Sequence, residues 1–127
     1  MRIEDYDSVC EAATSQEIEV ALSRRHGNGM NSFWLTDGNN DFPYINILAK
    51  GDVAYVHYFP EERHPGFASA AKVPVDKPHE TGVFFLYPTE KVWILNGEVI
   101  PFSDALKAAK EFAITTAMPK SIQWFEL

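Results

Sequence analysis

The chain has 127 residues, and 46% of them are hydrophobic and 13% aromatic, which is enough for a packed core and excludes a disordered segment. Eleven Lys and Arg against 18 Asp and Glu give a formal net charge of −7, which disfavours direct binding to nucleic acid or to an anionic membrane. Cys10 is the only cysteine, so internal disulfides and multi-cysteine metal sites are excluded.

We expect residues 1–127 to fold as one domain in the cytoplasm. The sequence contains no internal repeat and no long linker. Its first residues, MRIEDYDSVCEAA, have no basic segment ahead of an apolar run, so a signal peptide is not indicated. The longest apolar runs, such as VFFLY at 83–87, are too short to span a bilayer. A lone cysteine also fits a reducing compartment.

A capping box predicts the first helix. Thr14 is followed three residues later by Glu17, and such a pair satisfies backbone N–H groups at a helix start. Ile18, Ala21 and Leu22 then recur at helical spacing, until the HGNG segment ends the pattern. We therefore expect a short amphipathic helix near the N-terminus.

The middle of the chain changes to the pattern of strands. Residues 32–36, 42–49 and 52–59 are rich in β-branched and aromatic side chains. Only Lys50 and Gly51 separate the last two of these runs, which predicts a tight antiparallel hairpin.

Strands are also predicted after the Pro- and Gly-rich loop that follows this hairpin. Residues 66–73 have the composition of a short edge strand, and residues 83–87 and 92–95 are apolar runs of strand length. Asn96-Gly97 is a strong signal for a two-residue hairpin turn, and residues 98–100 are expected to continue after it as a strand.

The chain is expected to end in a helix and a strand. Ser103 can cap the helix, because its hydroxyl can accept hydrogen bonds from N–H groups of the first turn. The apolar stripe of this helix consists of Leu106, Ala109, Phe112 and Ala113. Pro119 prevents the helix from continuing, and residues 121–125 return as a strand that places Trp124 against the sheet or the last helix.

Together these elements predict an α+β fold. We expect a single antiparallel sheet of about five to seven strands. An N-terminal helix and a C-terminal helix should both pack on one face of this sheet, because each has a single apolar stripe to bury.

No catalytic or metal-binding pattern is present. The four histidines, at positions 26, 57, 64 and 79, form none of the spacings that zinc sites use. Cys10 lies among acidic residues, which disfavours a reactive thiolate, and the glycines form no phosphate-binding loop. We therefore predict a binding protein without cofactor or metal. A small enzyme with a pocket around His57 and Tyr55 stays open as the alternative.

Strand alternation sorts the central hairpin into two faces. Ile45, Ile47, Ala54, Val56 and Tyr58 share one face, which suits packing under the helices. The other face mixes rings and polar groups, a composition typical of protein interfaces, and acidic loops adjoin the same strands. The candidate partner-binding residues are Trp34, Tyr44, Tyr55 and His57 on this face, and Asp37, Asp41, Glu61 and Glu62 in the loops. The alternative is an ordinary amphipathic sheet surface, or one covered by residues 60–80.

Three segments resemble the Imm1 family of bacterial immunity proteins. They are ALSRR at 21–25 with the FWLT strand after it, the hairpin FPYINILAKGDVAYVHYF at 42–59, and the closing segment ALKAAKEFAITTAMPKSIQWFEL at 105–127. Within the family the likeness is greatest to the immunity proteins of double-stranded-DNA cytosine deaminase toxins. The chain departs from the family pattern at Met118, where an Arg commonly precedes the proline.

The resemblance implies inhibition of a toxin in the cytoplasm of the cell that produces it. The partner would be a cognate toxin domain, basic and directed at nucleic acid as a deaminase or nuclease, which type VI or contact-dependent systems deliver between bacteria. An acidic, ring-bearing surface would occlude its active site. An effector chaperone that binds the toxin without inhibiting it stays open as a further alternative, as does the oligomeric state.

Overall fold

The structure is a computed structural model that describes residues 1–127. The elements in chain order are β1 (Arg2–Glu4), β2 (Val9–Glu11), α1 (Ser15–Leu22), β3 (Met30–Thr36), β4 (Tyr44–Lys50), β5 (Val53–Phe59), β6 (Phe67–Ala70), β7 (Thr81–Tyr87), β8 (Glu90–Leu95), the 3-10 helix η1 (Asn96–Glu98), β9 (Ile100–Pro101), α2 (Phe102–Thr115) and β10 (Gln123–Glu126). The fold is α+β with two α-helices, as the sequence predicts.

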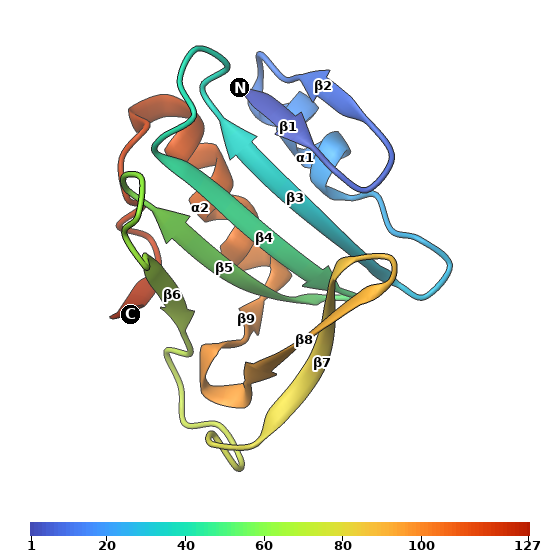
Figure 1. The fold of residues 1–127 in the computed structure, drawn as a ribbon, viewed down its shortest axis with the longest axis vertical. Coiled ribbons are helices and arrows are strands. Elements are labelled where there is room, and N and C mark those ends of the chain that lie inside the picture. Colours follow the sequence, from blue (N-terminus) through green and yellow to red (C-terminus); the bar gives the residue numbers. More distant parts are fainter.

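The main sheet is antiparallel and has eight strands, in the order β10-β6-β5-β4-β3-β1-β2, with β9 paired to β5 (Figure 1). At its centre lies the hairpin of β4 and β5, in which Lys50 stands opposite Val53. Gly51 takes up the turn with a φ of +58°, a conformation that glycine adopts without steric cost. The hairpin predicted at Lys50-Gly51 is thereby confirmed.

The eight strands of the main sheet, and a second sheet formed by β7 and β8 alone, correct the prediction of a single sheet of about five to seven strands. This ribbon lies across the face of the main sheet that is turned away from the helices (Figure 1). The expected hairpin at Asn96-Gly97 is wrong: these residues form η1, and the chain then pairs with β5 through β9 instead of returning along β8. The chain turns toward β5 because this path buries Ile100 in the main core, where the residue is only 3% exposed.

Helix α1 starts with the predicted capping box. The hydroxyl of Thr14 accepts a hydrogen bond from the N–H of Glu17 at 3.1 Å, and the Glu17 carboxylate accepts one from the N–H of Ala13 at 3.2 Å. Its description as an N-terminal helix needs correction, because the paired strands β1 and β2 precede it and extend the main sheet.

Helix α2 begins earlier than its predicted cap. Pro101 is still paired with Val53, and the N–H of Phe102 donates to the carbonyl of Asp52 at 2.8 Å. The helix starts directly at Phe102, so Ser103 already lies in its first turn and does not cap it. The predicted cap at Ser103 is therefore wrong, because the preceding strand and not a side chain fixes this helix start. Neither helix is long and apolar enough to cross a membrane.

The main core lies between the helices and the sheet. It contains all five hairpin side chains predicted for this face, together with Ala105, Ala108, Ala109 and Phe112 of α2. Leu106 and Ala113, which were expected in the buried stripe, are only partly buried against this core. Three small alanines face the sheet, so α2 can approach it closely and Phe112 fills the remaining space.

The closing strand β10 pairs with β6, so β6 is an interior strand and not the predicted edge. Trp124 packs against the main core with its ring centroid 6.1 Å from that of Tyr58, and its Nε1 donates to the carbonyl of Pro119 at 2.8 Å. The prediction that the tail is a paired strand with its tryptophan against the core is confirmed.

Replacing Phe112 with alanine is expected to destabilise the protein by about 3–5 kcal/mol, because the substitution removes a fully buried ring and leaves a cavity. Ile114→Ala on the same helix is the matched control, because that side chain is 86% exposed and should change stability by less than about 0.5 kcal/mol. Urea unfolding measures both values, and equal losses would contradict the assigned core.

Candidate partner-binding surface

The face of the main sheet opposite the helices carries a groove of about 320 Å³, which we call the aromatic groove. Its lining residues are Trp34, Tyr44, Asn46, Leu48, Tyr55, His57 and Phe59 from the main sheet, and Leu86, Val92 and Ile94 from the ribbon. The strands β3, β4 and β5 supply the floor, because side chains at every second position of a strand share a face. The structure thus brings together the four ring residues predicted from the sequence.

The ribbon covers one end of this face. Leu48, Tyr55, Ala68, Phe84 and Ile94 form a second buried cluster, separate from the main core. The cover expected from residues 60–80 is thus supplied mainly by residues 81–95, although Pro65 also reaches His57. The groove is the part of the face that the ribbon leaves open.

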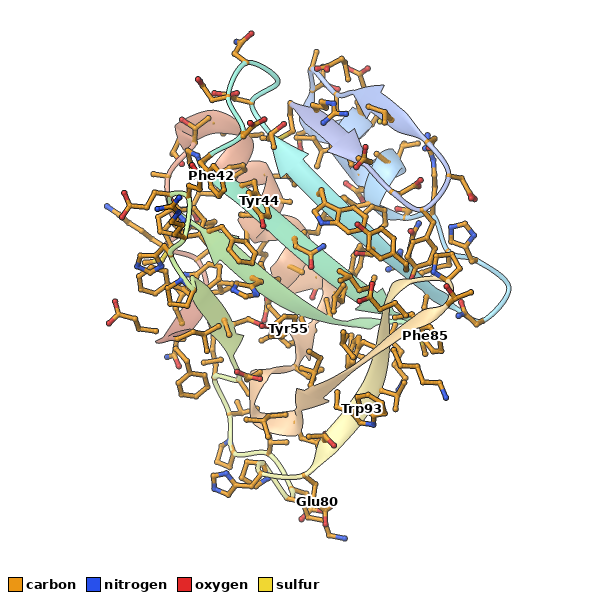
Figure 2. The ribbon with its side chains drawn as sticks, in the orientation of Figure 1. Phe42, Tyr44, Tyr55, Glu80, Phe85 and Trp93 are labelled. Carbon is orange, nitrogen blue, oxygen red and sulfur yellow. The ribbon has the colours of Figure 1, made fainter.

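Ring stacking fixes the side chains of the groove. The ring centroids of Tyr44 and Phe59 lie 4.5 Å apart, and those of His57 and Phe59 lie 3.8 Å apart. At the ribbon side, Trp34 stacks on Tyr87 with centroids 5.2 Å apart. Figure 2 shows Phe42 and Tyr44 toward one end of the sheet and Phe85 and Trp93 on the ribbon. The rings are thus held in place before any partner binds.

His57 is held by hydrogen bonds at both ring nitrogens. Its Nε2 lies 2.8 Å from the carbonyl oxygen of Pro65, which can only accept, so Nε2 carries the hydrogen. In the neutral ring Nδ1 is then an acceptor, and the hydroxyl of Tyr55 donates to it at 3.3 Å. Burial lowers the pKa of His57, an effect that the hydrogen bond to Pro65 partly offsets. Burial, and secondarily the charge of Glu98, raises the pKa of Tyr55.

Gly66 allows the loop to approach His57 this closely. Its φ is +89°, and a Cβ atom at this position would lie 2.6 Å from His57 Nε2 and 2.6 Å from the carbonyl oxygen of Tyr58. Any other residue would therefore clash with the ring and strain the backbone.

Asn46 places one free acceptor on the floor of the groove. Its Nδ2 donates to the hydroxyl of Ser32 at 3.1 Å and to the carbonyl of Phe33 at 3.0 Å, so both amide hydrogens are used. Its Oδ1 accepts no hydrogen bond within the chain, although the residue is only 7% exposed. Asn46 alternates with Ile45 and Ile47 along β4 and therefore lies on this face, but it was not among the candidate residues predicted from the sequence.

The four predicted carboxylates lie in two loops at the same end of the sheet. Strands β3 and β5 run in the same direction, so the loops that follow them, residues 37–43 and 60–66, emerge together (Figure 1). None of the four forms an ion pair within the chain. Asp37 accepts the N–H groups of Asn40 and Asn39 at 2.8 Å each, and these bonds lower its pKa. These four carboxylates do not line the groove but lie in the loops at its Tyr44 and Phe59 end, where Arg63 is the one Lys or Arg side chain among them. We call them its negative rim.

Two exposed aromatic side chains of the ribbon were not among the candidate binding residues predicted from the sequence. Tyr87 is 48% exposed at the mouth of the groove, and Trp93 is 63% exposed on the outer side of β8. The apolar run from Val92 to Leu95 has the pattern of a strand buried on both faces, so nothing in it signalled that one face is bare.

The geometry suits binding more than chemistry. No group of three or more His, Cys, Asp or Glu residues lies close enough together to hold a metal ion. His57 has no free ring nitrogen, and Tyr55 is 7% exposed. What the groove offers is rigid aromatic surface, one acceptor in its floor and a negative rim.

Comparison with known proteins gives two findings. The family model for immunity protein Imm1 matches residues 6–126. Over 128 aligned positions the chain is 29% identical to a double-stranded DNA deaminase immunity protein from Burkholderia cenocepacia (strain H111), and the match covers 100% of both chains.

His57→Gln is expected to reduce the acid sensitivity of folding. Because the pKa of His57 is lowered in the folded protein, the unfolded chain takes up the proton first as the pH falls. The stability that the neutral ring contributes is therefore complete above the ordinary pKa of 6.5 and is lost as the pH falls through the folded-state pKa. Urea unfolding at several pH values between about 7.5 and 5 measures this loss.

The exposed His79 supplies the control for this measurement, because His79→Gln removes a histidine that makes no hydrogen bond in the fold. Comparison of the two variants separates the loss of the hydrogen-bonded His57 ring from the loss of any histidine. If stability falls with pH as steeply in His57→Gln as in His79→Gln, His57 is not a neutral ring held by two hydrogen bonds.

Proposed function

The chain belongs to the Imm1 family of immunity proteins, and from this premise we propose that it binds a cognate toxin domain and inhibits it by covering its active site. The relative from Burkholderia cenocepacia suggests the toxin's chemistry, a deaminase that acts on double-stranded DNA. The encounter would take place in the cytoplasm of the cell that makes both proteins. The observation that carries the proposal is the aromatic groove with its unpaired carboxylates at one end.

Charge is the first argument. A toxin that holds DNA needs basic side chains around its active site, because phosphate contacts dominate affinity for the duplex. This chain has a net charge of −7, and four carboxylates of the groove rim are not neutralised within the fold. Complementary charge of this kind speeds association by about 10- to 1000-fold at low salt. The inhibitor would thus occupy the position of the anionic substrate.

Rigid rings are the second argument. Trp and Tyr are enriched among the residues that contribute most to binding free energy, because they bury large area at little entropic cost. Trp34 and Tyr44 are the candidate contact residues, and their stacking on Tyr87 and Phe59 holds them in place before binding. Such anchors chiefly slow dissociation, whereas the carboxylates chiefly speed association.

Tyr55 and His57 have a supporting role in this proposal. Tyr55 is nearly buried, and its hydroxyl orients the ring of His57, which in turn stacks on Phe59. The pair gives the groove floor its shape and contributes little free hydrogen-bonding capacity. This arrangement favours an inhibitor over a small enzyme with a His57 and Tyr55 pocket, because a general base needs a ring nitrogen that can reach a substrate.

Two measurements test the proposed function. The toxin domain encoded beside the gene for this chain should copurify with it, and its activity on DNA should fall as the chain is added. A complex that forms while the toxin stays fully active would indicate an effector chaperone. A toxin that neither binds nor loses activity would refute the proposal.

Reversing the charges of Glu61 and Glu62 to Lys should slow association with the toxin by about tenfold at low salt and weaken its salt dependence. Both side chains are exposed and make no ion pair, so folding should be unaffected. Stopped-flow association at several ionic strengths gives the rate constants, and equal rates would remove this loop from the interface.

Glu19 on α1 supplies the matched control. Its carboxylate lies on the other side of the sheet, where it pairs with Lys110 at 2.9 Å. Glu19→Lys changes the net charge as much as Glu62→Lys does. If the two single reversals slow association equally, overall charge and not the groove rim steers the encounter.

A further inference from the structure

The pairing of the ribbon determines which backbone groups of β8 are free. The N–H of Asn96 donates to the carbonyl of Glu80 at 2.9 Å, and from there opposed residues exchange hydrogen bonds at every second position, as far as the irregularity between Phe85 and Tyr87. The positions that exchange bonds are Gly82 with Ile94 and Phe84 with Val92. Lys91 and Trp93 occupy the intervening positions, so their N–H and C=O groups point away from β7.

On β7, Val83 stands opposite Trp93 and Phe85 stands opposite Lys91. The backbone groups of Val83 and Phe85 therefore point away from β8, toward the outer edge of β7. Lys50 Nζ donates to the carbonyl of Val83 at 3.1 Å, and the hydroxyl of Tyr6 donates to the carbonyl of Phe85. These side chains fasten β7 to the main sheet, so the open edge of the ribbon is that of β8.

This open edge runs along the aromatic groove. Val92 and Ile94, on either side of Trp93, line the groove with their side chains. The alternation turns the backbone N–H and C=O of Lys91 and Trp93 away from β7, and no hydrogen bond outside the strand ladder uses them. Trp93 itself is 63% exposed on the outer side of the strand (Figure 2). A row of unpaired groups beside an apolar groove is the arrangement to which an extended segment adds as a strand.

We infer that the toxin contributes an extended segment that pairs with β8 as a third strand of the small sheet and fills the aromatic groove. This inference rests on the proposed function and adds how the partner is held. Backbone hydrogen bonds to Lys91 and Trp93 fix the direction and register of the segment. Alternate side chains of the segment then point toward the groove floor and toward solvent.

The groove selects a basic segment. Asn46 Oδ1 is an acceptor without a partner, so it suits a donor such as an Arg or Lys side chain. The same cation can lie over the ring of Tyr44, where the negative face of the ring attracts it. Asp37, Asp41, Glu61 and Glu62 at the end of the groove attract further basic residues of the segment.

Proline at position 91 tests strand addition directly. Lys91→Pro removes an N–H that points away from β7, whereas Lys91→Ala removes the same side chain and keeps the N–H. The Pro variant should bind the purified toxin domain at least about tenfold more weakly than the Ala variant. Calorimetric titration gives both dissociation constants, and thermal unfolding of the free variants shows whether each is folded. Equal affinities of two folded variants would overturn the inference.

Hydrogen exchange on the wild-type chain supplies a readout that needs no substitution. The amides of Lys91 and Trp93 should exchange slowly in the complex and fast in the free protein. If the wild type inhibits the toxin while these amides stay unprotected, strand addition is wrong and the proposed function stands. If the free chain already protects them and dimerises on size-exclusion chromatography, a second copy and not the toxin occupies the edge. If the toxin does not bind at all, the proposed function itself fails.

Discussion

The antiparallel pairing of β4 with β5 is the constraint on which the rest of the structure depends. Its register places Ile45, Ile47 and Val56 under the two helices and turns Tyr44, Asn46 and His57 to the opposite side. A slip of one residue would exchange the two sets and bury polar groups in the main core. The glycine turn and the apolar face together fix this register, so stability and the candidate binding surface have one origin.

The ribbon of β7 and β8 decides how much of the second face stays open. Its inner side chains, Phe84 and Ile94, bury Leu48 and Tyr55, which would otherwise leave a large apolar surface in water. Beyond this cover the aromatic groove remains, bordered by β8, whose outer edge has no strand beside it. The same element therefore completes a core and shapes a surface on which a partner can be held.

Polar groups in the groove divide into two kinds. Those of Tyr55 and His57 form hydrogen bonds within the fold. Gly66 permits the bond between His57 and Pro65, because it has no side chain that would clash with the His57 ring. Asn46 Oδ1 accepts no hydrogen bond in the chain, and the rim carboxylates form no ion pair, although Asp37 accepts N–H groups of its own loop. All of them are acceptors or negative charges. An unpaired set of one sign is typical of recognition, because it attracts one class of partner and repels others. Inhibition of a basic, DNA-acting toxin fits that selectivity.

The sequence by itself determined the features that depend on neighbouring residues: the capping box at Thr14, the two faces of the β4–β5 hairpin, the paired closing strand with Trp124, and the Imm1 likeness that the comparisons bear out. Only the tertiary structure decided that α2 starts at Phe102, that the chain leaves Asn96-Gly97 toward β5, and that β7 and β8 form a separate ribbon. It also decided that Trp93 is exposed and Tyr55 buried. These outcomes follow from contacts between segments far apart in the chain, whose burial outweighs local turn and capping preferences that are worth only about 1 kcal/mol each.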